Sequence, residues 1–149
     1  MISKDQIDAI GITVEAEGIQ RFMIFLSADG NVKRSGTGRM MDTKDDLYMG
    51  QSSEPMFKNV MNSVGEGILN YVNKEIDLPN PQGILCKLTI QFNIEGAMQR
   101  LVINYGHQSG YPDDIVMIVK AAFEATQPWY EKMKMGQEPK KKKGFWPFK

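Results

Sequence analysis

Residues 86–94, Cys-Lys-Leu-Thr-Ile-Gln-Phe-Asn-Ile, decide the fold of this 149-residue chain. Apolar side chains stand at every second position from Cys86 to Ile94, and polar side chains stand between them. Because successive side chains of a strand point to opposite faces, this alternation predicts a strand with one buried and one solvent-facing side. The turn pair Glu95-Gly96 and a second alternation over residues 101–105 predict that the chain returns as the next strand.

The first half of the chain predicts a second group of strands. Residues 19–27 are apolar at odd and even positions, so this strand is expected to be central and covered on both faces. Asp29-Gly30-Asn31 predicts a hairpin turn, because glycine and Asx residues tolerate positive φ. The polar return strand over residues 32–38 is expected at the edge of the sheet, and the alternation over residues 12–16 predicts a further strand.

Three segments predict helices. A capping-box spacing in residues 3–6 predicts a short helix over residues 4–10. Apolar residues at helical spacing predict a long helix over residues 55–75 and another over residues 112–135. Pro128 is expected to kink or break the last helix, because proline lacks the backbone N–H that a helix interior needs.

Together these elements predict an α+β fold, an antiparallel sheet of about five strands with helices packed on it, in the order α-β-β-β-α-β-β-α. This order is similar to the element order of the small dimeric chaperones of type III secretion. Residues 1–135 are expected to form this single domain, and residues 136–149 a flexible basic and aromatic C-terminal tail. A chain of this length can bury roughly two thirds of the surface that its unfolded form exposes.

The formal net charge is zero, but it is unevenly distributed. Residues 136–149 hold five lysines and one acid, Glu138, which leaves 13 basic and 17 acidic side chains in residues 1–135. A mildly acidic body argues against nucleic acid as a partner. The N-terminus lacks the pattern of a signal peptide, no apolar run reaches 18 residues, and the single cysteine suits a reducing compartment, so we expect a cytoplasmic protein.

Residues that commonly carry chemistry are scarce. His107 lies in a glycine-flanked loop, and with Asp113 and Asp114 it defines an alternative hypothesis, a small enzyme with a carboxylate and histidine site. Cys86 lies on the apolar side of its predicted strand, where burial makes a thiol inert. One cysteine and one histidine cannot supply the four ligands of a structural zinc site. The sequence therefore predicts no catalytic residues, no metal and no cofactor.

Methionine and aromatic residues are the candidates for a contact surface. The chain has eleven methionines, and methionine adapts to irregular partners. Met40, Met41 and Met49 lie in residues 39–52, which are predicted to be a loop, and we expect them to contact a partner. Trp129-Tyr130 could anchor an interface, since both residue types are enriched at hot spots, or could pack the last helix onto the sheet.

The C-terminal tail combines a basic run with an aromatic tip. Its candidate binding residues are Lys140, Lys141, Lys142, Lys143, Phe145, Trp146 and Phe148. Four adjacent lysines cannot share a packed core, because each would bury an unpaired charge. The tail is therefore expected to dock into a partner's apolar groove or to bind an anionic membrane surface, unless it is a solubilising extension without function.

These observations predict a non-enzymatic protein-binding module. It would escort or neutralise another polypeptide, as secretion chaperones and toxin-immunity proteins do. A sheet with one solvent-facing side and an edge strand can also pair with a second copy, so a homodimer is a further prediction. The alternatives are the small enzyme with a site around His107 and a membrane-surface adaptor recruited by the tail.

Overall fold

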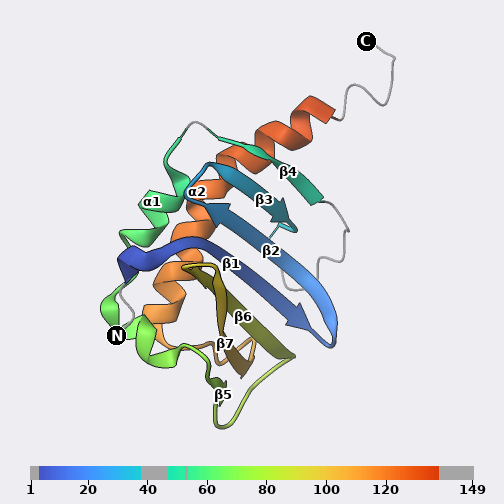
Figure 1. Ribbon diagram of the computed structural model, residues 1–149. Coiled ribbons are helices and arrows are strands. Elements are labelled where there is room, and N and C mark those ends of the chain that lie inside the picture. The colour runs from blue at the N-terminus through green and yellow to red at the C-terminus, as the bar shows by residue number, and fades with distance from the viewer. Residues whose placement is uncertain (1–3, 38–46, 53, 138–149) are drawn as a thin grey trace.

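The computed structural model describes residues 4–37, 47–52 and 54–137, and it confirms the α+β character. The strands are β1 (Ile7–Ala16), β2 (Ile19–Ser27), β3 (Asn31–Ser35), β4 (Leu47–Gln51), β5 (Glu75–Asp77), β6 (Leu85–Ile94) and β7 (Ala97–Gly106). The helical elements are η1 (Lys4–Gln6), α1 (Met56–Met61), η2 (Glu66–Tyr71) and α2 (Asp113–Gln137). The seven strands form one sheet in the order β4-β3-β2-β1-β6-β7-β5 (Figure 1).

The predicted five-stranded antiparallel sheet is wrong in strand number, pairing and element order. The sheet is mixed, because β5 runs parallel to β7 while all other neighbours are antiparallel. Four strands precede the first α-helix, so the similarity in element order to the secretion chaperones is lost.

The predicted N-terminal helix over residues 4–10 is also wrong. A single 3₁₀ turn at Lys4–Gln6 is followed at once by β1, which pairs with β2 on one side and β6 on the other. Ile7 and Ile10 are 5% and 1% exposed in this central strand. Burial between two neighbouring strands therefore outweighs the local capping-box preference.

The predicted long helix over residues 55–75 is divided into two short pieces. α1 ends at Met61, and the backbone of Gly65 is extended before η2 begins. Glycine costs about 1 kcal/mol in a helix interior, so Gly65 and Gly67 favour a break between two apolar segments. Val60 and Ile68 remain buried in the separate pieces.

Pro128 does not break α2, which runs without interruption through it. Tyr130, directly beyond the proline, is 1% exposed, so packing against the sheet holds the second half of the helix in place. The predicted edge position of β3 is wrong, because β4 pairs with its outer side and lies inside the segment predicted to be a loop.

The two faces of the sheet differ. Figure 1 shows α2 crossing behind the sheet with α1 beside it, and the core lies between these helices and the strands. Among the described residues no layer covers the opposite face, which we call the open face. Met23 and Phe25 of β2 lie on it half-buried, so the prediction that this strand is covered on both sides is wrong.

Candidate functional site

The outer edge of β4 is the first distinctive feature of this sheet. Ser52 donates its backbone N–H to the carbonyl of Gly30 over 2.9 Å, which makes these two residues a hydrogen-bonded pair at the start of the β3–β4 ladder. Bonded and non-bonded pairs alternate along an antiparallel ladder. The backbone N–H and C=O groups of Leu47, Met49 and Gln51 therefore point away from β3, toward the side of β4 where the described part of the chain has no further strand.

The side chains of β4 leave this edge unprotected. Its sequence, Leu-Tyr-Met-Gly-Gln, has no charged residue and no proline, and its register with β3 shows no bulge. Leu47 and Met49 are 51% and 59% exposed, although both are large and apolar. Sheet edges that remain single are normally shielded by charges, proline, bulges or very short strands, so β4 has the character of a strand that accepts a neighbour.

The opposite edge of the sheet provides a comparison within the same molecule. β5 has three residues, and its acidic side chains Glu75 and Asp77 are exposed. Asn104 of β7 donates to both carboxylates, at 2.9 and 2.7 Å. This edge has the shortness and the charge that discourage pairing, and β4 has neither.

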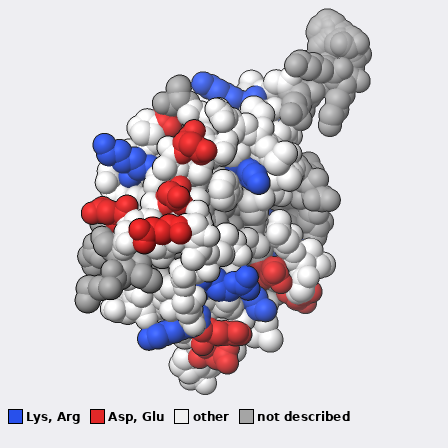
Figure 2. Space-filling model, in the orientation of Figure 1, with Lys and Arg blue, Asp and Glu red and all other residues white. Residues whose placement is uncertain are grey.

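The open face next to β4 has an uncharged centre. Phe25, Gly11 and Gln91 form one row across neighbouring strands, and Met23 and Thr13 belong to the next row. Lys33 stands at the β4 side of the first row, with its ammonium 5.2 Å from the Phe25 ring centroid. Figure 2 shows uncharged side chains across the middle of this face, with acidic and basic groups mainly around it. Loss of charge at the centre of a patch is typical of protein interfaces.

Of the predicted contact residues, the structure places Met49 at this edge. Met40, Met41 and the tail residues from position 138 onward lie outside the described part of the chain. Trp129 is partly buried, and its ring approaches Gly50 of β4 from the helix side. Tyr130 is 1% exposed and packs edge-on against Tyr48, with ring centroids 5.7 Å apart. These two aromatic residues of α2 therefore pack against the helix-covered face of β4.

A buried arginine fixes this support. Arg34 of β3 is fully buried, and its guanidinium donates to Thr126 Oγ1 at 3.0 Å and Gln127 Oε1 at 2.8 Å, both on α2. It also stacks over the Tyr130 ring, 4.3 Å from the centroid, and its Nε donates to the Gly36 carbonyl at 3.2 Å. The planar guanidinium suits this combination of forked hydrogen bonds and ring stacking. Arg34 thus ties the second half of α2 to the strands beside β4.

His107, the residue of the enzyme hypothesis, joins two loops. The imidazole Nδ1 of His107 accepts a hydrogen bond from the backbone N–H of Ile84 at 2.7 Å. The backbone N–H of His107 donates to the Ile84 carbonyl at 2.9 Å. Ser109 Oγ accepts the N–H of Gln82 at 3.2 Å. These bonds hold the loop before β6 against the loop after β7, which is a structural task.

Cys86 and Tyr105 lie at the same end of the sheet. Burial raises the pKa of the Cys86 thiol, and a hydrogen bond from Tyr105 offsets part of that rise. Burial also raises the pKa of Tyr105, whose side chain is 5% exposed. Both groups are therefore neutral near pH 7, and a thiol held neutral is a poor nucleophile.

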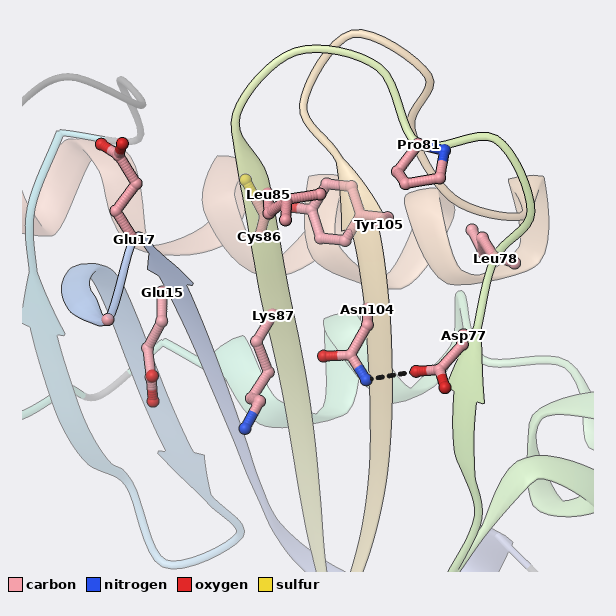
Figure 3. Close-up of a pocket in the computed structure, with 11 residues that line it drawn as sticks. Glu15, Glu17, Asp77, Leu78, Pro81, Leu85, Cys86, Lys87, Asn104 and Tyr105 are labelled. Atoms are coloured by element: carbon pink, nitrogen blue, oxygen red, sulfur yellow. Dashed lines mark hydrogen bonds between the residues drawn. The ribbon is translucent and has the colours of Figure 1, made fainter.

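A cavity of about 530 Å³ opens beside these two residues. Figure 3 shows Glu15 and Glu17 on one side of it and Asp77 on the other, with Lys87 and Asn104 between them. The carboxylates face different parts of the cavity and do not converge. Within the described residues, no group of three or more His, Cys, Asp or Glu side chains is placed to hold a metal ion.

Comparisons with protein-family models, with curated protein sequences and with solved structures found no match to this chain. In the described part of the chain, no helix has both the length and the apolar character needed to cross a membrane. Sequence reasoning placed Met49 in a loop and did not predict the strand edge that it occupies, because residues 39–52 show neither strand nor helix periodicity. The absence of charge and proline over residues 47–51 was the available indication.

Proposed function

We propose that the protein is a non-enzymatic protein-binding module that takes an extended segment of a partner polypeptide onto the free edge of β4. The observation that carries this proposal is the unprotected edge itself, with outward backbone groups and the exposed side chains of Leu47 and Met49. Addition of a strand satisfies those backbone groups and extends the sheet, which is an established mode of peptide recognition. The shielded β5 edge supports the same choice of side.

The chemistry of β4 defines the partner segment. Its side chains alternate between two environments. Leu47 and Met49 lie on the open face, whereas Tyr48 packs on Tyr130 and Gly50 lies over Trp129. A strand added here would meet apolar surface on both faces and no charge on β4. We therefore propose an uncharged, extended segment rich in apolar residues, which the module would keep extended and covered. That task suits either an escort or a neutralising protein.

The test uses the full chain and a library of displayed twelve-residue peptides. Selection should enrich uncharged segments with apolar residues, and hydrogen exchange of the complex should slow at the amides of Leu47, Met49 and Gln51. Met49→Lys should weaken binding by about tenfold or more, because it places a lysine on the edge strand. Natural edge strands use such charges to prevent pairing with another strand. Met117→Lys is the matched control, since Met117 lies on α2 and is 57% exposed against 59% for Met49.

Two outcomes redirect or reject the proposal. Peptides that bind Met49→Lys as tightly as the wild type, or that protect amides elsewhere, would reject β4 as the site. Light scattering that shows a wild-type dimer and a Met49→Lys monomer would identify the occupant as a second copy of this chain.

A further inference from the structure

A second cavity, of about 490 Å³, lies where α2 meets the sheet and is lined by residues outside β4. Its walls are mainly apolar and aromatic, with Phe22 and Tyr105 from the sheet and Tyr111 and Phe123 from the helix side. Tyr105 and Tyr111 pack edge-on with their centroids 4.8 Å apart. Cavities of this size and lining are typical of sites for small organic ligands.

Arg21 places a positive charge in the wall of this cavity. The register pairs Val14 with Phe22 and Glu15 with Gln20, so Arg21 is the extra residue of a β-bulge. In a regular strand, Arg21 and Phe22 would point to opposite faces. Both are buried here, 6% and 5% exposed, because the bulge turns Arg21 out of the alternation. Bulges commonly redirect a side chain next to functional sites.

The hydrogen bonding of Arg21 is incomplete. Its Nη2 donates to the Ala16 carbonyl at a long 3.3 Å and lies 3.7 Å from Glu17 Oε1, on a side chain that is 64% exposed. Its Nε is buried and finds no acceptor among the described residues. A buried guanidinium with one distant, solvated carboxylate is costly unless another acceptor completes its bonding.

We infer that this cavity binds an amphipathic organic anion, a carboxylate carried on an apolar body, with the carboxylate on the Arg21 guanidinium and the body against Phe22, Tyr111 and Phe123. An arginine fork matches a carboxylate in two parallel hydrogen bonds. Arg21 Nε is buried within the protein, so an anion in the cavity cannot reach it in the present conformation. We therefore expect the guanidinium to leave the Ala16 carbonyl and turn toward the bound anion. Lys120 at the exposed rim attracts the same charge. No residue of β4 lines this cavity, although its Phe22 and Phe123 rings also contact the Arg34 guanidinium.

To test this, the full chain is titrated with decanoate below its critical micelle concentration, and binding is measured by calorimetry and by NMR chemical-shift changes. Decan-1-ol and decyltrimethylammonium carry the same apolar body without the anion. Decanoate should bind to saturation at one site, and both comparison compounds at least about tenfold more weakly, since a charge-assisted hydrogen bond is worth that factor. Equal binding of the alcohol and the acid would overturn the inference, as would no saturation by decanoate.

Two variants locate the site. Arg21→Met keeps the stem of the side chain and should weaken decanoate about tenfold or more, while Arg100→Met, an exposed cation on β7, should leave it unchanged. If Arg21→Met does not fold, Val116→Trp decides, because Val116 lines the cavity and is 38% exposed. Filling the cavity there should abolish binding, and Met117→Trp on the neighbouring exposed position should not. Full binding by Val116→Trp would overturn the inference.

Discussion

Gly36, which follows β3, is the position where a single methyl group should disturb this fold most. Its φ is +86°, in the left-handed region that costs a side-chain residue about 1–2 kcal/mol. A Cβ at Gly36 would also lie 2.3 Å from the carbonyl oxygen of Arg21, a backbone atom of the bulge that cannot rotate away. Overpacking of this kind costs about 1–3 kcal/mol. Gly36→Ala should therefore lower the free energy of unfolding by roughly 2–5 kcal/mol.

Two other glycines separate the two causes. Gly96 has a φ of +82° and no atom within 4 Å of its Cβ position, so Gly96→Ala measures backbone strain alone. Gly106 lacks a positive φ, but its Cβ would lie 2.3 Å from the backbone nitrogen and oxygen of Gln82, so Gly106→Ala measures the close approach alone. If the causes add, the loss in Gly36→Ala should equal roughly the sum of the other two losses.

Urea unfolding of the four proteins, followed by tryptophan fluorescence and circular dichroism, gives the measurement. In thermal unfolding the expected loss for Gly36→Ala corresponds to roughly 10 °C, at about 3 °C for each kcal/mol in a chain of this size. The free energies of unfolding lost by Gly36→Ala and Gly96→Ala are then compared. If they agree to within about 0.5 kcal/mol, the usual error in additivity, the close approach of Gly36 to the bulge is refuted.

Four further predictions concern single features. Arg34→Lys keeps the charge but loses the forked hydrogen bonds to α2, so it should speed hydrogen exchange in β4 and in the second half of α2 together. Unchanged exchange would show that Arg34 does not stabilise β4. His107→Ala should cost about 0.5–1.5 kcal/mol in urea unfolding, with partial recovery in His107→Asn; no loss would contradict its bond to Ile84. The raised pKa of Cys86 should make its alkylation at pH 8 much slower in the native than in the urea-unfolded protein, whereas equal rates would place the thiol in solvent. Deletion of residues 139–149 should abolish salt-sensitive binding to anionic liposomes if the tail is a membrane adaptor, and unchanged binding would reject that role.

The elements that sequence reasoning identified are those whose periodicity is complete within one segment. The hairpin of β6 and β7, the strand β2 and the helix α2 are confirmed within a few residues of their predicted bounds. Each has an apolar pattern within its own segment, either strand-like or at helical spacing, so local pattern and tertiary burial favour the same structure.

The elements that it missed depend on partners far away in the chain. The three residues of β5, Glu-Ile-Asp, have no pattern of their own and become a strand because β7 accepts them in parallel register. The capping box before β1 is overridden by pairing on both sides. The bulge at Arg21 could not be predicted from the alternation of side chains. It exists only in the pairing with β1, whose register shifts by one residue between Val14 and Glu15.

The candidate site follows the same division. Met49 was predicted as a contact residue from its residue type and a loop assignment. The role proposed for it depends instead on β3, whose register directs the Met49 backbone groups to the outer side of β4. Arg34 is a charged residue on the covered face of a short polar strand, where a sequence pattern favours an exposed edge. That strand is interior because β4 pairs with its outer side. The bonds from Arg34 to Thr126 and Gln127 hold the neighbouring Trp129 and Tyr130 on the helix-covered face of β4. Arg34 thus ties α2 to the strand that pairs with β4, and the other side of β4, where the structure describes no neighbouring strand, is the surface proposed to bind a partner.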